Sequence, residues 1–346
     1  MTYQEVLEAA RTCSGPYCKA CPVCNGKACR NQMPGPGAKG VGDTAVRNYE
    51  KWQDVRVNMD TLTENVPVDT GIELFGKHFQ YPIFAGPVGA VKLHYGDQFS
   101  DVEYNDILVP ACREAGIAAF TGDGTDAHVM EAATAAIGKN DGFGIPTVKP
   151  WNKETVDEKL KLIRESRSFA VAMDIDAAGL PFLKNLTPPA GRKSVAELRE
   201  IIDGFREHRI PFIVKGVMTV KGAMKAVEAG ASGIVVSNHG GRVQDQCPAT
   251  AEVLYEIAGA VHKAAPEVKI LVDGGLRSGV DIFKALAMGA DAVIVARPYV
   301  TAVYGGGAEG VRLLTEKLGS ELADTMSMCG ASKLSEITPD MVRMPH

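Results

Sequence analysis

Two alternating patterns of apolar residues run along most of this chain. Short β-branched runs, typical of buried parallel strands, are each followed by a stretch with the three-to-four-residue apolar period of a helix. The eight expected strands are YPIFAG, GIAAFT, GIPTVK, FAVAMDI, PFIVK, GIVVSN, KILVD and DAVIVA. The eight expected helices span Val102–Glu114, Ala127–Ile137, Lys153–Arg164, Val195–Glu207, Thr219–Ala229, Thr250–Lys263, Val280–Met288 and Glu309–Met326.

Eight strand–helix units over about 250 residues are what a (β/α)8 TIM barrel requires, because each parallel strand needs a crossover helix. A doubly wound sheet is the alternative, since strand order is not visible in a sequence. Before the barrel come an amphipathic helix in MTYQEVLEAART, a cysteine-rich segment and the loop QMPGPGAKGVGD. We therefore expect an N-terminal unit over residues 1–45 and a barrel over residues 46–346.

Composition narrows the class of partner. The 346 residues carry a formal net charge of −5 and are 45% hydrophobic, with no apolar run of about 18 residues that could span a membrane. The opening helix lacks the basic start and apolar core of a signal peptide, so we expect a cytoplasmic protein. Mild acidity without a basic block argues against nucleic acid as the main partner.

Polar side chains gather where two neighbouring strands end. Lys215 follows FIV, whereas Ser237, Asn238, His239 and Arg242 follow IVV. In parallel α/β proteins the side chains at the carboxyl ends of strands face the ligand rather than the core. These residues are therefore candidates for a binding or catalytic site.

The last two strand ends indicate a phosphate site. The sequence VDGGLRSGVD places a glycine pair and Arg277 before a helix, and VARP places Arg297 at the end of the eighth strand. Closely approaching backbone N–H groups and guanidinium groups bind phosphate, often after strands 7 and 8 of a barrel. The plainer interpretation is that the glycines turn the chain and the arginines are surface charges.

Seven motifs in this region together resemble one family. They are Lys215-Gly216-Val217, Ser237-Asn238-His239-Gly240-Gly241-Arg242, Pro248-Ala249-Thr250, Asp273-Gly274-Gly275, Arg277-Ser278-Gly279, Phe283-Lys284-Ala285-Leu286-Ala287 and Ala296-Arg297-Pro298. The chain is similar there to the FMN-dependent 2-hydroxy-acid dehydrogenases and oxidases, which act on lactate, glycolate and mandelate. The resemblance is dense from about Pro211 to Pro298, weaker from Tyr81 to Gly179, and absent over the cysteine segment.

The resemblance implies a role for each matching residue. His239 is the base that takes the substrate's proton, Arg242 binds its carboxylate, Asp176 holds the histidine, and Lys215 stabilises the reduced flavin. Those residue types suit the chemistry, because imidazole accepts protons near neutral pH and a guanidinium binds a carboxylate at two points. The implied FMN positions are Pro87, Val88, Gly89, Thr147, Lys215, Ser237, Asp273, Gly274, Gly275, Arg277, Ala296 and Arg297.

Three positions depart from the family. Where the family has Gln-Leu-Tyr at the end of the third strand, this chain has Thr147-Val148-Lys149, and Asp174 stands where the family has Thr. The family's second substrate-binding Arg has no clear counterpart, although Lys184 lies near its position. Lys149 either replaces the Tyr as a substrate contact or is a surface lysine.

The cysteines are concentrated in one segment. Of eight in the chain, five lie between Cys13 and Cys29, and Cys18, Cys21, Cys24 and Cys29 have the spacing C-x2-C-x2-C-x4-C. Thiolates so close can converge on one centre, with Cys13 as a spare. We favour an iron–sulfur cluster, because a flavin gains from a one-electron relay nearby. Zinc is the rival, and unligated thiols or a disulfide are the plainer alternative.

Three functions follow from these signals. The first is oxidation of a 2-hydroxy acid to a 2-oxo acid by transfer of the Cα hydrogen to FMN, or the reverse reaction. The second is an FMN-dependent reductase or flavin-assisted isomerase on the same barrel, and the third is a non-catalytic flavin or metal sensor. The resemblance also implies a homotetramer and a carboxylate substrate, whereas the electron acceptor is left open.

Overall fold

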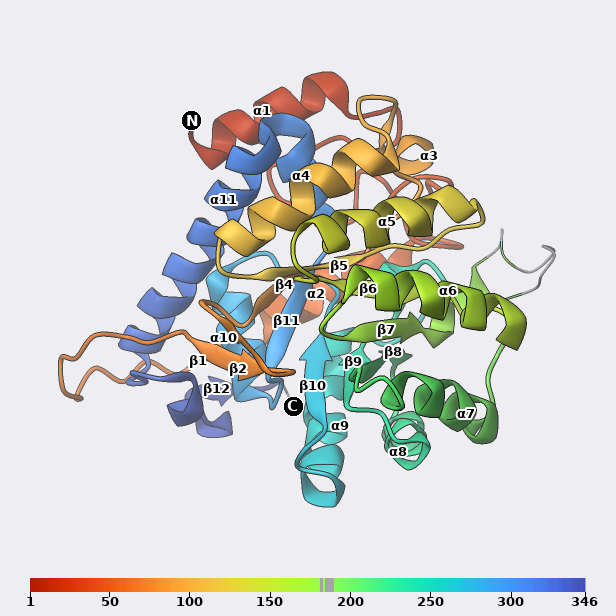
Figure 1. Ribbon diagram of the computed structural model, residues 1–346. Coiled ribbons are helices and arrows are strands. Elements are labelled where there is room, and N and C mark those ends of the chain that lie inside the picture. Colours follow the sequence, from red (N-terminus) through yellow and green to blue (C-terminus); the bar gives the residue numbers. More distant parts are fainter. Residues whose placement is uncertain (181–182, 184–189, 346) are drawn as a thin grey trace.

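The computed structural model describes residues 1–180, 183 and 190–345, and its centre is a closed barrel of eight parallel strands (Figure 1). The strands are β4 (Ile83–Ala85), β5 (Ala118–Thr121), β6 (Ile145–Val148), β7 (Val171–Asp174), β8 (Phe212–Val217), β9 (Gly233–Val236), β10 (Lys269–Val272) and β11 (Ala292–Val295). Closure comes from pairing of β11 with β4, where Val293 lies opposite Ile83. The predicted barrel is confirmed, and the doubly wound sheet is wrong.

Seven of the expected helices begin and end within two residues of the prediction. They are α4 (Asp101–Glu114), α5 (Ala127–Lys139), α6 (Lys153–Ser166), α7 (Val195–Arg206), α8 (Val220–Ala229), α9 (Thr250–Ala264) and α10 (Gly279–Ala287). Local chemistry explains several of the starts: Ser100 caps α4 and Ser194 caps α7, each in a reciprocal capping box with the glutamate three residues on.

The eighth helix differs from its prediction. We expected it to begin at Glu309, but α11 spans Arg297–Met328 and is interrupted by Gly307, whose φ is +53°. The run Gly305-Gly306-Gly307 has poor helix propensity and conceals the first turns in the sequence pattern. Those turns form because their apolar residues, including Tyr299 and Val303, are fully buried.

The barrel interior is apolar at one end and polar at the other. Inward-facing residues such as Phe84, Phe120 and Ile213 form one cluster with Leu74 and Phe79 of the hairpin β2 (Ile72–Leu74) and β3 (Lys77–Phe79). This hairpin immediately precedes β4, so it closes the amino-terminal end. The opposite, carboxyl-terminal end is left for polar side chains, as is usual in this fold.

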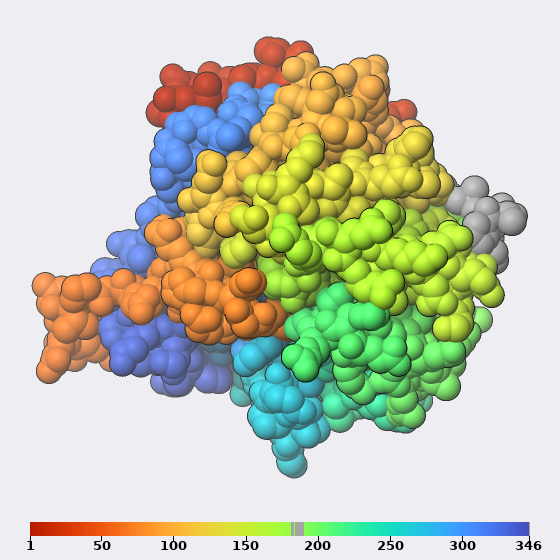
Figure 2. Space-filling view, in the orientation of Figure 1, coloured from red at the N-terminus to blue at the C-terminus, as the bar shows by residue number. Residues whose placement is uncertain are grey.

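The N-terminal part of the chain packs onto the barrel. Helix α1 (Tyr3–Cys13) lies beside α11 in Figures 1 and 2, and a Cβ at Gly305 would meet the Val6 carbonyl oxygen at 1.9 Å. The Gly- and Pro-rich loop QMPGPGAKGVGD leads directly into α2 (Asp43–Asp54), a helix that the sequence pattern did not indicate. The pattern also missed β1 (Arg56–Val57), α3 (Val91–Tyr95), β12 (Val342–Arg343) and four short 3-10 helices, η1 (Ile175–Gly179), η2 (His239–Gly241), η3 (Leu334–Glu336) and η4 (Pro339–Met341).

Among the described residues, no helix is both long enough and apolar enough to cross a membrane.

Candidate active site

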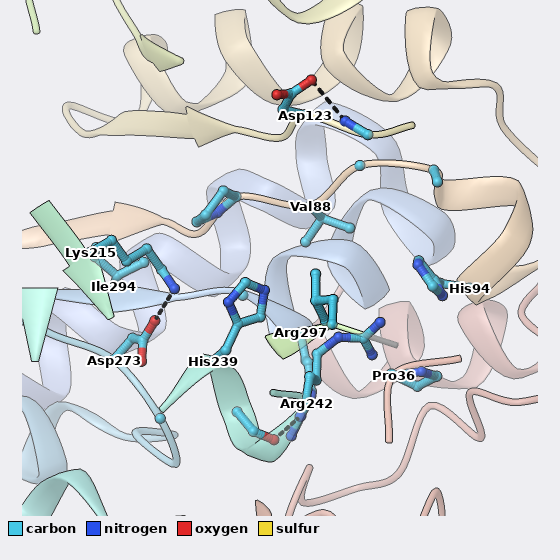
Figure 3. A pocket seen from close by; sticks show the side chains of 18 of the residues that line it. Pro36, Val88, His94, Asp123, Lys215, His239, Arg242, Asp273, Ile294 and Arg297 are labelled. Atoms are coloured by element: carbon cyan, nitrogen blue, oxygen red, sulfur yellow. Dashed lines mark hydrogen bonds and ion pairs between the residues drawn. The ribbon is translucent and has the colours of Figure 1, made fainter. Parts of the chain in front are cut away.

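One cavity at the carboxyl ends of the strands collects most of the predicted site residues. Those that line it are Pro87, Val88, Gly89, Lys149, Lys215, His239, Arg242, Asp273, Gly274, Gly275, Arg277, Ala296 and Arg297. In Figure 3, Lys215 and Asp273 lie on one side of His239, and Arg242 and His94 lie on the other. Asp176 and Ser237 do not line the cavity themselves, but Asp176 contacts His239, and Ser237 contacts both Lys215 and His239. Thr147 is buried in β6 and is not among the lining residues. Lys184, near the position of the family's second Arg, lies outside the described residues.

His239 is held between two carboxylates. Its Nδ1 lies 3.0 Å from Oδ1 of Asp176, and its Nε2 lies 3.9 Å from Oδ2 of Asp174. The backbone N–H of His239 donates to the Ser237 hydroxyl, and the φ of His239 is +56°. A left-handed conformation is unfavourable for histidine, so the turn after β9 holds this side chain against a local preference.

Burial and nearby cations keep His239 neutral. Burial, followed by the charges of Lys215 and Lys149, holds the pKa of His239 well below its usual value. Burial also raises the pKa of Asp176 above its ordinary range, while Lys215 and Lys149 oppose that effect. A neutral imidazole with Nδ1 engaged by a carboxylate presents Nε2 as a proton acceptor.

Lys215 supplies a fixed positive charge at the floor of the cavity. Its Nζ lies 3.1 Å from the Ser237 hydroxyl and 3.3 Å from Oδ2 of Asp273. Burial favours its neutral form, but the charges of Asp273, Asp176 and Asp174 outweigh burial and raise the pKa of Lys215 to about 12. Lys215 therefore stays charged although it is buried.

Lys149 is not a surface residue, so that interpretation is wrong. Its ammonium group forms an ion pair with Asp174 at 2.6 Å, and the side chains are only 12% and 2% exposed. Lys149, directly after β6, and Asp174, on β7, are both departures from the family, and they thus form a matched pair of opposite charges. The Asp174 carboxylate of this pair lies 3.9 Å from Nε2 of His239.

Arg242 is oriented by the N-terminal loop. Its Nη1 donates to the carbonyl oxygens of Gly35 and Gly37, and the Gly35 N–H donates to Nδ1 of His94 at 3.0 Å. Burial lowers the pKa of Arg242 to about 10, so the guanidinium is charged at neutral pH. The loop before α2 is therefore one wall of the cavity and not only a connection.

The strand ends expected to bind a phosphate carry two glycines in the left-handed region, and both arginines there bond to backbone carbonyl oxygens. Gly274 and Gly275 have φ of +87° and +89°, and a Cβ at Gly275 would meet the Asn48 carbonyl oxygen at 2.2 Å. Arg297 donates to the Gly240 carbonyl oxygen at 2.9 Å. Arg277 donates to the carbonyl oxygen of Cys24 at 2.7 Å, so the cysteine segment contacts this site.

The donor and acceptor pattern of the cavity fits a flavin. Among the described residues, Oδ1 of Asp273, which lines the cavity, is buried without a hydrogen-bond partner, and so are the hydroxyl groups of Thr121 and Thr147 at the ends of β5 and β6. A buried polar atom without a partner is costly, so such a group points to a ligand that satisfies it. The heteroatom edge of an isoalloxazine ring offers such partners, and Arg277 and Arg297 provide charge for a phosphate.

Sequence reasoning missed three residues near this cavity. Asp123 follows β5 and is held by Lys159 at 2.8 Å and by the Trp151 indole at 2.7 Å. His94 of α3 has a pKa lowered to about 3, first by burial and then by Arg242 and Lys149. Asn48 of α2 exchanges two amide hydrogen bonds with Asn238. Only Asp123 carried a signal, because it too stands at the end of a strand.

The cysteines do not form a preformed mononuclear metal site. Among the described residues, the only group of three potential ligands with all ligand atoms within 4.8 Å is Asp174, Asp176 and His239. Cys18, Cys21, Cys24 and Cys29 are free and line a second cavity of about 530 Å³. Tyr95, Arg277 and Arg297 line both cavities, so the second lies directly beside the first.

Comparison with known proteins identifies the class that this fold and site define. The model of the family described as FMN-dependent dehydrogenase matches residues 35–185 and 182–344. The chain belongs to this family.

Relatives within this family differ in their sequence identity to this chain and in how much of it they match. The chain is 29% identical to 4-hydroxymandelate oxidase of Amycolatopsis orientalis, over 89% of this chain and 94% of the relative. It is 42% identical to a peroxisomal (S)-2-hydroxyacid oxidase of Arabidopsis thaliana, but that match spans only 44% of this chain and 39% of the relative. A crystal structure of mandelate oxidase with (S)-2-phenylpropionate is 26% identical, with a TM-score of 0.75 over 99% of this chain and 97% of that one.

Proposed function

We propose that this protein oxidises a 2-hydroxy acid to the corresponding 2-oxo acid, with FMN as its cofactor. The observation that carries the proposal is the single cavity in which a neutral, carboxylate-held His239 stands beside the charged Arg242. Membership of the FMN-dependent dehydrogenase family and the named activities of its relatives support the same reaction.

Each side chain has a defined task in this reaction. Arg242 binds the substrate carboxylate through its guanidinium, and the carbonyl oxygens of Gly35 and Gly37 fix its direction. His239 then accepts the hydroxyl proton at Nε2. Asp176 stabilises the imidazolium that forms, because its carboxylate already faces Nδ1.

FMN, when bound, supplies the acceptor for the hydrogen that leaves Cα with its electron pair. Lys215 would hold the pyrimidine edge of the ring, where its fixed charge stabilises the anionic reduced form. Thr147 would contact the same ring, as the family resemblance implies, and Arg277 and Arg297 would bind the phosphate. Loss of one proton to His239 and of a hydride from Cα leaves the 2-oxo acid, which balances the reaction.

The test is anaerobic reduction of the enzyme-bound flavin by a panel of 2-hydroxy acids, with 2-oxo acid measured as product. Replacing His239→Ala should lower the rate of flavin reduction about 10² to 10⁴-fold, the usual contribution of a positioned base, while flavin stays bound. The matched control is His78→Ala, because His78 is exposed on β3, away from the cavity. Equal rates in both variants would contradict the role of His239.

The alternative reactions are not favoured by the comparisons, since the named relatives cited above are oxidases of hydroxy acids. A non-catalytic sensor would have no use for a proton acceptor and a carboxylate clamp in one cavity.

We further propose that the protein is cytoplasmic. From the family resemblance, we propose that it is a homotetramer. We also propose that residues 1–45 act as a metal-binding unit on the barrel of residues 46–346. Four thiolates suit an iron–sulfur cluster or, alternatively, zinc.

A further inference from the structure

The second cavity has a lining that matches the cysteine spacing. It is lined by Cys18, Cys21, Cys24 and Cys29 and by none of the other four cysteines in the chain. Cys13, the spare candidate, directs its thiol to the Tyr304 carbonyl oxygen at 3.1 Å. The fold therefore selects the same four thiols that the spacing selects.

Contacts with the barrel and with α1 fix the position of this segment. Arg277 binds the Cys24 carbonyl oxygen at 2.7 Å, and Arg11 binds the Ala20 carbonyl oxygen at 3.0 Å. Further along, the Lys39 N–H donates to the Gly241 carbonyl oxygen at 2.8 Å. The thiols thus face a defined cavity, and none of them is in a disulfide.

The charges around the cavity suit an anionic centre. A guanidinium nitrogen of Arg277 lies 3.8 Å from Sγ of Cys24, and Arg297 lines the same cavity. Asp281 is an acidic residue of the lining, but its carboxylate is already engaged, because it accepts hydrogen bonds from the backbone N–H groups of Arg277 and Ser278. Four thiolates with their irons carry net negative charge, and N–H donors to sulfur are part of how proteins tune such clusters.

The separation of the sulfur atoms distinguishes the two candidate metals. Zinc with bonds of about 2.3 Å to four thiolates in a tetrahedron places the sulfur atoms about 3.8 Å apart. Among the described residues, no three cysteine sulfur atoms lie within 4.8 Å of one another. A four-iron cluster binds each thiolate to a different iron atom and so needs wider spacing of the sulfur atoms within a larger cavity.

We infer that Cys18, Cys21, Cys24 and Cys29 hold an iron–sulfur cluster in this cavity, against Arg277 and Arg297. The inference goes beyond the oxidation of a hydroxy acid and does not depend on it. It places a second redox centre beside the site proposed for the flavin phosphate.

The experiment is anaerobic purification of the full chain, followed by iron, zinc and acid-labile sulfide analysis and a visible spectrum after flavin removal. We expect about four irons with matching sulfide and a broad absorbance near about 400 nm. One zinc without sulfide would overturn the cluster, and so would the absence of any metal. Flavin reduction by hydroxy acids is measured separately, so a metal-free but active protein refutes only the cluster.

Matched variants test the ligand set. Cys24→Ser and Cys29→Ser should each lose most of the iron, whereas Cys13→Ser should keep it, because the Cys13 thiol contacts the Tyr304 carbonyl oxygen and Cys13 does not line the cavity. Circular dichroism and flavin content establish that each variant is folded. Iron retained in Cys24→Ser, or lost equally in Cys13→Ser, would refute the assignment.

Discussion

Replacing Lys149→Met should move the acid limb of the activity profile to higher pH. The ammonium group of Lys149 pairs with Asp174 at 2.6 Å, and Oδ2 of the same carboxylate lies 3.9 Å from Nε2 of His239. In the native chain Lys149 helps to lower the pKa of His239. Without the lysine, the unpaired carboxylate favours the protonated imidazole.

The separation of Lys149 from His239 sets the size of the effect. The ammonium group lies no farther from Nε2 than the sum of the 2.6 Å and 3.9 Å contacts through Asp174, about 6.5 Å. Two unit charges about 6 Å apart interact by about 3 kcal/mol at an effective dielectric constant of about 20, which corresponds to an upward shift of about two pKa units. Surrounding dipoles reduce that figure, so we expect a shift of about one to two units.

The direction in which the acid limb moves follows from the protonation state in which His239 reacts. His239 acts as a base only when it is neutral, so raising its pKa removes active enzyme at the acid side of the profile. The assay is kcat/KM for flavin reduction between about pH 5 and 9, with a thermal melt of each variant because an unpaired buried charge costs stability. The double variant Lys149→Met with Asp174→Asn should restore the native limb. An acid limb that stays in place or moves to lower pH would refute the reasoning.

Three further predictions follow from other contacts. Arg277→Ala should release FMN more readily, measured as flavin content after dialysis, and unchanged occupancy would place the phosphate elsewhere; the flavin released from the native protein on denaturation should be FMN and not FAD. Asp176→Asn should slow the same step as His239→Ala, because the protonated imidazole loses its partner; a native rate of flavin reduction would exclude that role. Gly305→Ala should lower the free energy of unfolding by about 2 kcal/mol or more, since its Cβ has no room against α1, whereas Gly259→Ala on α9 meets nothing within 4 Å and should stabilise by about 0.5 to 1 kcal/mol. Chemical denaturation compares the last pair, and equal effects would contradict the close packing of α1 on α11.

The sequence alone determined the barrel and the strand ends. Parallel strands buried on both faces must be apolar, and each return helix shows its own period, so both signals are local along the chain. The predicted residues Lys215, His239 and Arg242 lie at one cavity because the carboxyl ends of all eight strands meet there. The same rule accounts for Arg277 and Arg297.

Only the tertiary structure decided which distant segments complete the site. The Gly35 carbonyl oxygen reaches Arg242, the Cys24 carbonyl oxygen reaches Arg277, and each contact joins residues more than 200 positions apart. The pairing of Lys149 with Asp174 is also a matter of strand adjacency, since β6 and β7 become neighbours only when the barrel forms. Local periodicity carries no information about such contacts, because they depend on loop paths and close packing rather than on the pattern of any one segment.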